Sequence, residues 1–107
     1  MSRVVYRDMQ ERLLVNSLEM ENGCWQWLGR ATKDGYGLIN VRQGSKHVAR
    51  RAHHVAYEFF IGPVPAGLEL DHKCYNRRCI HPNHVIPATR QQNNANRRGY
   101  RSNHANP

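Results

Sequence analysis

The chain has 107 residues, of which 16 are Lys or Arg and 8 are Asp or Glu, so its formal net charge is +8. Typical domains contain about 100–150 residues, so this length predicts one domain over 1–107, with a thin apolar core. The positive charge favours a polyanionic partner, and the absence of any run of about 18 apolar residues argues against a membrane span.

The N-terminal half predicts a helix followed by strands. Residues 7–20 carry apolar side chains at roughly helical spacing, and the Asn22-Gly23 pair supplies a helix stop. Strands are expected at 24–29, at 36–41 and at 46–50, forming an N-terminal antiparallel sheet. The first strand places Trp25 and Trp27 on one face, where packing in the core is a commoner role for tryptophan than stacking on bases.

The C-terminal half predicts a helix, two short strands and a last helix. Apolar residues within 51–61 follow an i, i+3, i+4 spacing, and a Gly-Pro pair ends this helix. Thr89 and Gln92 form a capping-box pattern, so the last helix should begin near Arg90 and end at Gly99. The other expected segments are a strand at 68–72, a loop at 73–84, a short strand at 85–86 and a loosely held tail at 100–107.

The acidic residues are confined to one part of the chain. Every Asp and Glu lies at or before Asp71, whereas residues 72–107 combine Lys and Arg with no acid at all. One-sided basic clusters are typical of phosphate-binding faces, although a solvated run of charge has the same composition. The arginines expected to contact DNA are Arg50, Arg51, Arg77, Arg78, Arg97 and Arg98. The first four are also candidates for contact with the scissile phosphate.

Cysteine and histidine recur at even spacing in the polar, basic loop. Cys74, Cys79 and His84 are five residues apart, and Cys24, the only other cysteine, joins them by elimination. Three thiolates and one imidazole complete a closed tetrahedral Zn²⁺ shell of the structural kind. The alternative, cysteines buried as small hydrophobic residues, suits an apolar run better than this loop. Three cysteines cannot all pair as disulfides, so a reducing, cytoplasmic compartment is expected, without secretion.

A second group of polar residues predicts chemistry. Asp71 and His72 end a short strand, and Asn93 lies in the first turn of the last expected helix, which can fold back across that strand end. Carboxylate and amide oxygens suit Mg²⁺ or Mn²⁺, and a histidine beside such an ion is a natural general base for water. His53 and His54, on the preceding helix, are expected at the surface or in packing.

These residues resemble a known family. The stretch LDHKCYNRRCIHPNHVIPATRQQNN is similar to the core of HNH endonucleases, of the ββα-metal (His-Me finger) group. It most closely resembles the zinc-containing His-Cys box homing endonucleases, and the resemblance covers roughly residues 23–98. Asp71 departs from the His-Cys box pattern and matches plain HNH enzymes, which keep a metal ligand at this position. The His-Cys box spacing is kept in full. The resemblance assigns His72 as the base, Cys74, Cys79 and His84 as zinc ligands and Asn93 as the ligand of the catalytic metal.

The resemblance implies an α+β fold, namely a small ββα-metal nuclease with a structural zinc and a nuclease core at about residues 68–99. It also implies a metal-dependent DNA endonuclease of bacterial or phage origin that leaves 5′-phosphate and 3′-hydroxyl ends. Double-stranded DNA is the expected partner, and a homodimer is an additional candidate assembly. Two alternatives stay open: a zinc-stabilised DNA-binding module without catalysis, and a ribonuclease or broad-specificity nuclease.

Overall fold

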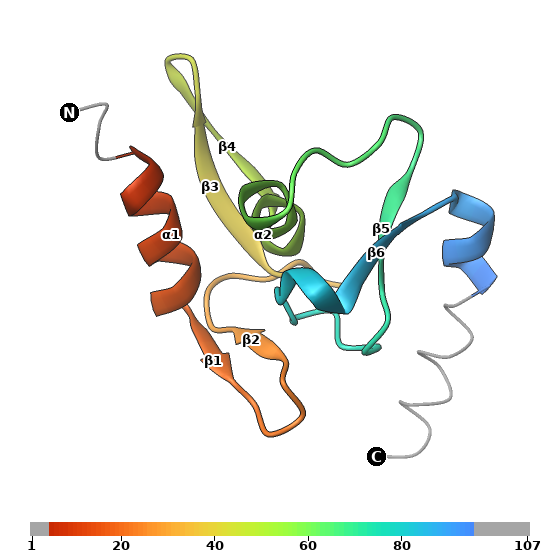
Figure 1. Cartoon of the computed structure of the whole chain (residues 1–107). Helices are drawn as coiled ribbons and strands as arrows, with labels where there is room; N and C mark the ends of the chain where they lie inside the picture. Colours follow the sequence, from red (N-terminus) through yellow and green to blue (C-terminus); the bar gives the residue numbers. More distant parts are fainter. Residues whose placement is uncertain (1–4, 96–107) are drawn as a thin grey trace.

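The computed structural model describes residues 5–95 (Figure 1). The helical elements are α1 (Val5–Val15), α2 (Ala52–Phe60), the 3-10 turn η2 (Pro82–His84) and a last helix that begins at Arg90 and is described to residue 95. The strands are β1 (Ser17–Glu19), β2 (Trp25–Trp27), β3 (Leu38–Gln43), β4 (Lys46–Arg51), β5 (Glu69–His72) and β6 (Val85–Ala88). The expected helix end at Gly99, the tail at 100–107, Arg97 and Arg98 lie outside the described residues.

The strands form three separate antiparallel pairs, in the order β1-β2, β3-β4 and β5-β6. The prediction of a single N-terminal sheet was therefore wrong, because β2 pairs with β1 and not with β3. The cause lies at the end of α1, which stops at Val15 instead of continuing to residue 20. The side chains of Asn16 and Ser17 donate hydrogen bonds to the carbonyls of Arg12 and Leu13, at 2.8 and 2.9 Å, and so end the helix. The chain then enters β1.

The core is built around Trp27, which is 3% exposed and packs with apolar residues of α1, β3 and α2. Its indole Nε1 donates to the carbonyls of Arg30 and Leu38 at 3.1 Å, which satisfies its polar atom inside the core. Gly37 makes room for the ring, since a Cβ there would lie 2.6 Å from Trp27 Cδ1. Trp25 packs against the edge of the same cluster. Both tryptophans therefore serve the core, as expected.

Helix α2 forms as its spacing predicts. Ala52, Val55 and Ala56 are buried on the face that packs into the core. His53 is buried as well, at 6% exposed, whereas His54 forms an ion pair with Glu58 at 3.1 Å. Helix α2 thus presents one histidine to the interior and one to the surface.

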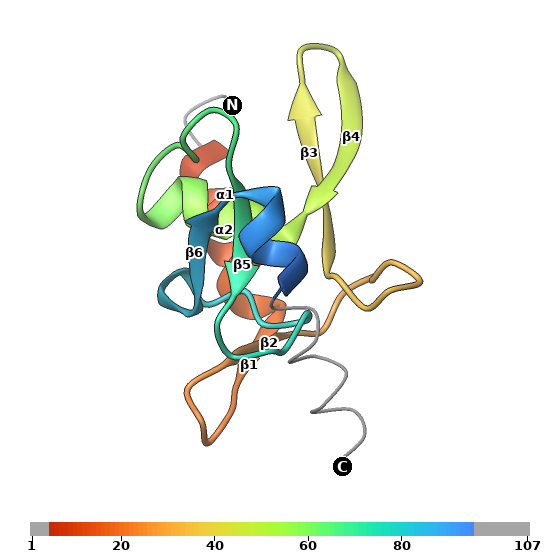
Figure 2. The same cartoon turned by 90° about the vertical axis from the view of Figure 1, so that its right-hand side faces the viewer.

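The hairpin β5-β6 and the last helix follow one another in the chain and lie side by side (Figure 2). The capping box forms as predicted: Thr89 N donates to Gln92 Oε1 at 2.9 Å, and Gln92 N donates to Thr89 Oγ1 at 3.1 Å. Strand β6 is two residues longer than expected because it continues through Pro87, which is tolerated where only one edge of a strand is paired. The described part of the chain is thus a small α+β fold with antiparallel strand pairs.

No helix among the described residues is long and apolar enough to cross a membrane.

Candidate metal centre and active site

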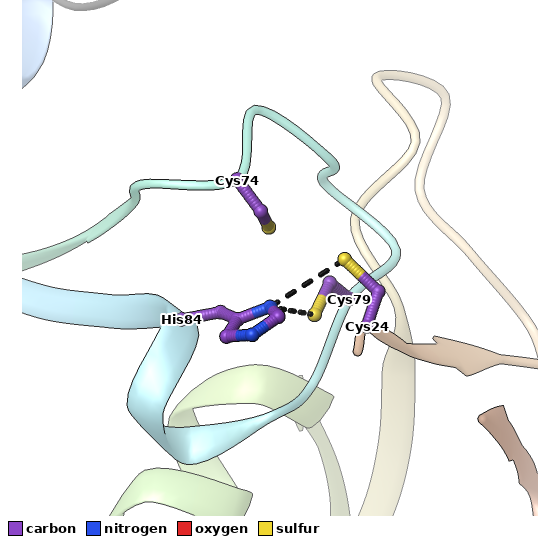
Figure 3. A group of neighbouring side chains, drawn as sticks. All are labelled: Cys24, Cys74, Cys79 and His84. Atoms are coloured by element: carbon purple, nitrogen blue, oxygen red, sulfur yellow. Dashed lines mark hydrogen bonds between the residues drawn. The ribbon is translucent and has the colours of Figure 1, made fainter. Parts of the chain in front are cut away.

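Four side chains from two distant parts of the chain meet in one cluster, as Figure 3 shows. The ligand atoms of Cys24, Cys74, Cys79 and His84 all lie within 4.8 Å of one another. His84 Nδ1 is 3.5 Å from the sulfurs of both Cys24 and Cys79. Tetrahedral zinc, with bonds of about 2.3 Å to sulfur and 2.0–2.1 Å to nitrogen, separates such ligand atoms by about 3.6 Å. The predicted Cys3His set is therefore compatible with a zinc site.

Backbone pairing explains how Cys24 reaches the cysteine loop. Cys24 immediately precedes β2, and Gln26 of β2 forms an antiparallel bridge with Cys79. Trp27 N donates to the carbonyl of Arg78, and Ile80 N donates to the carbonyl of Trp25, both at 2.8 Å. Strand β2 thus holds Cys79, the second cysteine of the loop, close to Cys24, the residue just before the strand.

His81, which had no role in the sequence interpretation, supports the histidine ligand. Its Nδ1 accepts a hydrogen bond from Asn83 N at 3.1 Å and so caps η2, the turn that ends at His84. The His81 and His84 rings stack at 4.6 Å with an interplanar angle of 17°, and the Trp25 ring lies 4.4 Å from the His81 ring. The orientation of the His84 ring is thereby restrained.

The thiols of the cluster differ in acidity. A hydrogen bond from Cys79 lowers the pKa of the Cys74 thiol to about 5. The same contact raises the pKa of Cys79, and burial raises the pKa of Cys24. The Cys74 thiol is therefore the most acidic of the three. A divalent cation bound by the cluster would stabilise all three thiolates.

His72, the predicted general base, is 1% exposed at the end of β5. Its Nε2 lies 3.0 Å from the carbonyl oxygen of Cys79. A carbonyl only accepts hydrogen bonds, so Nε2 carries the proton of the neutral ring and Nδ1 keeps its lone pair. Burial lowers the pKa of His72 from its ordinary value, which favours this neutral form.

Aromatic and basic side chains surround His72. The His53 ring of α2 lies 4.4 Å from the His72 ring, and Tyr36 lies 5.9 Å from it. Arg51 and Arg77 place their guanidinium carbons 4.9 and 5.2 Å from the centre of the Tyr36 ring. Burial lowers the pKa of His53 well below its ordinary value, so this neighbour adds no charge to the group at neutral pH.

Asp71 lies on the other face of β5, since adjacent strand residues point to opposite sides. It is 1% exposed, and it lines a cavity of about 340 Å³ with Lys73 and with Gln92 of the last helix. Glu69, two residues earlier, shares this face. Asp71 and His72 are therefore neighbours at the end of β5, but their side chains point to opposite faces of the strand.

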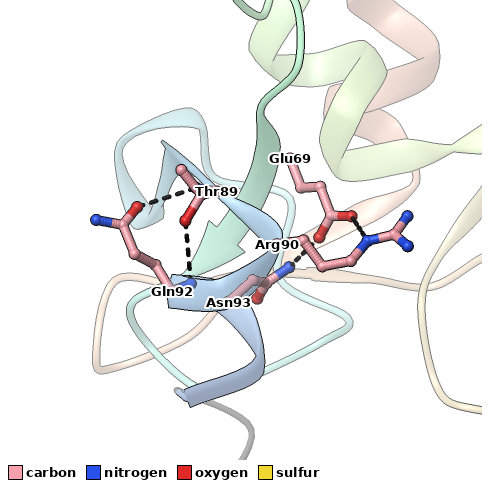
Figure 4. A network of polar contacts seen from close by, with 5 residues as sticks. All are labelled: Glu69, Thr89, Arg90, Gln92 and Asn93. Carbon is pink, nitrogen blue, oxygen red and sulfur yellow. Dashed lines mark hydrogen bonds and ion pairs between the residues drawn. The ribbon is translucent and has the colours of Figure 1, made fainter.

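Asn93 of the last helix bonds to Glu69 of β5, as Figure 4 shows. Its Nδ2 donates to Glu69 Oε1 at 2.8 Å, and Arg90 donates to the other oxygen of the same carboxylate at 3.1 Å. A carboxylate can only accept hydrogen bonds, so the amide nitrogen of Asn93 is the atom that faces Glu69. The Oδ1 of Asn93 remains available to another partner. The oxygen is the atom that a hard divalent cation would require.

Comparison with known proteins gives the family of the chain. The family model described as HNH endonuclease matches residues 50–95. The uncharacterised gene 5.3 protein of Enterobacteria phage T3 is 31% identical over 63% of this chain and 69% of its own length. The chain belongs to the HNH endonuclease family. The predicted HNH resemblance is thereby confirmed.

Other phage proteins are also similar to this HNH endonuclease family member. Protein 2.8 of Escherichia phage T7 is 28% identical over 80% of the chain, and Protein 7.7 of the same phage is 33% identical over 65%. The chain spans 57% and 51% of these two relatives, about half of their length. No solved structure matches.

The arginines predicted to bind DNA divide into two groups in this HNH chain. Arg50 pairs with Glu58 at 2.9 Å, and Arg78 donates to the carbonyl of Trp27 at 2.8 Å, so both are engaged in holding the fold. Arg51 and Arg77 lie over the Tyr36 ring, next to His72, and Arg77 also donates to the carbonyl of Asp34 at 3.0 Å.

Three residues near the candidate site were not among the predicted site residues: Tyr36, His53, which was expected at the surface or in packing, and Glu69. Tyr36 and His53 are more than fifteen residues before His72 and meet it only through folding. Glu69 carried a usable signal, because it lies two residues before Asp71 in an expected strand and so shares its face.

Proposed function

We propose that this chain is a metal-dependent DNA endonuclease in which His72 activates the attacking water. The observation that carries the proposal is the 3.0 Å contact between His72 Nε2 and the Cys79 carbonyl, because it leaves Nδ1 as a proton acceptor. A neutral, oriented imidazole is the side chain best suited to take a proton from water near pH 7. In the proposed step the water oxygen bonds to phosphorus, its proton passes to Nδ1, and the bond to the 3′ oxygen breaks. The leaving 3′ oxygen takes a proton from solvent water, so the products are a 5′-phosphate and a 3′-hydroxyl.

Asp71 and Asn93 are the residues proposed to hold the catalytic cation. Asp71 supplies a carboxylate that is almost wholly buried, and the bond from Asn93 to Glu69 leaves an amide oxygen on the same side of β5. Both are hard oxygen ligands of the kind Mg²⁺ and Mn²⁺ take. When bound, such an ion polarises a phosphoryl oxygen and stabilises charge on the leaving 3′ oxygen.

The zinc cluster has a proposed part in catalysis through Cys79. Its sulfur belongs to the metal cluster, and its carbonyl accepts the hydrogen bond from the base. A zinc ion bound by the four ligands would hold both groups of this one residue in place. We propose that structural zinc thereby fixes the orientation of the His72 ring.

Supercoiled plasmid tests the proposed function. Purified protein should convert it to nicked or linear DNA when Mg²⁺ is added, and should be inactive when Mg²⁺ is left out. Leaving out Mg²⁺ is preferable to a strong chelator, which would also remove zinc. Binding without any nicking would favour the zinc-stabilised binding module, and equal cutting of RNA would favour a broad-specificity nuclease.

Substitutions at Glu69 and Asn93 test the cation site. Asn93→Ala should lower the nicking rate, and raised Mg²⁺ should restore part of it. Glu69→Leu, which removes the acceptor that orients the amide, should raise the Mg²⁺ concentration for half-maximal rate about 10–100-fold, as is typical for partners of metal ligands. Nicking rate against Mg²⁺ concentration, measured for each variant, gives both quantities.

Reversing the hydrogen bond provides the control. Asn93→Asp places two carboxylates together, and adding Glu69→Gln restores a donor and should recover metal affinity. Arg90→Gln removes only the exposed ion pair with Glu69 and should have little effect. Equal Mg²⁺ dependence in Glu69→Leu and the wild type would contradict this role of Glu69.

A further inference from the structure

The β3-β4 ribbon has one face that is turned away from the core. Its register pairs Leu38 with Arg51, Asn40 with Ala49 and Arg42 with His47. Alternate residues of a strand share a face. These six residues therefore form one surface, here called the outer face, and all of them except Leu38 are exposed. On the opposite side Ile39 and Val41 are buried in the core.

The outer face is basic. Arg42 and Arg51 belong to it, and Arg30 extends over it, because its guanidinium donates to the side-chain oxygen of Asn40 at 2.8 Å. The sequence has no Asp or Glu between Asp34 and Glu58. Glu58 pairs with Arg50, whose position in the register belongs to the inner row of the ribbon. Glu58 thus pairs with a cation of the inner row and not with an arginine of the outer face.

One end of the outer face reaches the proposed catalytic residue. Arg51, the last residue of β4, lies over the ring of Tyr36, which in turn lies 5.9 Å from the His72 ring. A polyanion that follows the outer face toward its base would therefore arrive beside the general base.

The shape of the ribbon suits a groove of double-stranded DNA. The β3-β4 turn extends away from the rest of the fold in both views (Figures 1 and 2). A strand of this length spans about 20 Å, and two paired strands lie about 4.8 Å apart. The major groove of B-DNA is about 12 Å wide and admits a two-stranded ribbon.

We infer that the outer face of the β3-β4 ribbon enters a groove of duplex DNA and brings a backbone phosphate to His72. This inference rests on the proposed function, since it names the surface by which the nuclease holds its substrate. The arginines supply phosphate contacts, and Asn40 and His47 are the polar groups on the face that can meet base edges.

Two neighbouring cations on opposite rows of the ribbon provide the test. Arg42→Gln removes a charge from the outer face, and Lys46→Gln removes one from the inner row near the same turn. Affinity for a fluorescently labelled 30-base-pair duplex is measured by anisotropy at 50 and 200 mM salt, with Mg²⁺ omitted. DNA affinity should fall as salt rises from 50 to 200 mM. If Arg42→Gln loses one phosphate contact, its affinity should fall about 3-fold less over this range than the affinity of the wild type.

Lys46→Gln should keep the salt dependence of the wild type. Arg42 also donates to the Gly44 carbonyl at 3.2 Å, so Arg42→Lys is the control that loses this bond and keeps the charge. It should bind with the salt dependence of the wild type.

The inference is overturned if Arg42→Gln and Lys46→Gln change the salt dependence equally, or if neither changes it. Plasmid nicking, measured on the same preparations, separates the two proposals. If the protein nicks plasmid but its DNA affinity does not depend on Arg42, only the inference about the ribbon surface is overturned. Duplex binding that depends on Arg42, in a protein that never nicks, would support the ribbon surface and contradict the nuclease.

Discussion

Cys79→Ser is expected to abolish zinc binding and to unfold the protein. The thiol is one of four candidate ligands whose donor atoms lie within 4.8 Å of one another, and the core around the cluster is small. Structural zinc sites contribute about 10–16 kcal/mol of apparent binding free energy, which is similar in size to the total stability of a typical domain, about 5–15 kcal/mol. The small core cannot replace a contribution of that size.

Metal analysis and thermal unfolding measure this effect. Wild-type protein should carry about one tightly bound zinc per chain, and Cys79→Ser should carry none and lose its cooperative transition. Asn83→Ala, at an exposed position between the two last ligands, is the matched control and should keep the metal. A zinc-free wild-type protein with a cooperative unfolding transition would refute the structural zinc.

His72→Ala is expected to lower the nicking rate by about 10²–10⁴-fold, the usual effect of losing a general base. DNA affinity and zinc content should remain, because the ring is proposed to hold neither the phosphate nor either metal. Added Mg²⁺ or Mn²⁺ should not restore the rate, since no ion replaces a missing proton acceptor. Free imidazole, which can occupy the space left by the side chain, should restore part of it.

His54→Ala provides the control for the base. This histidine is paired with Glu58 at the surface of α2 and should be dispensable for nicking. Rates come from plasmid nicking on gels, and binding is measured on the same preparations. Equal nicking by His72→Ala and the wild type would reassign Asp71 and His72 to a structural pair and favour the binding-module alternative.

The sequence by itself determined the features that depend on short spacing. Three such features lie close together in the chain. They are the strand that ends at His72, the candidate metal ligands of the cysteine loop and the capping box at Thr89. Helix α2 likewise follows from its own apolar periodicity. Such features are encoded locally, so pattern and side-chain chemistry suffice to predict them.

The tertiary structure alone decided which distant segments meet. Cys24 lies beside the cysteine loop because the backbone of β2 forms hydrogen bonds with the backbone of that loop. Tyr36 and His53 reach His72 only once β3-β4 and α2 have packed. These contacts arise from backbone pairing and burial between remote parts of the chain, and no local pattern of residues records them.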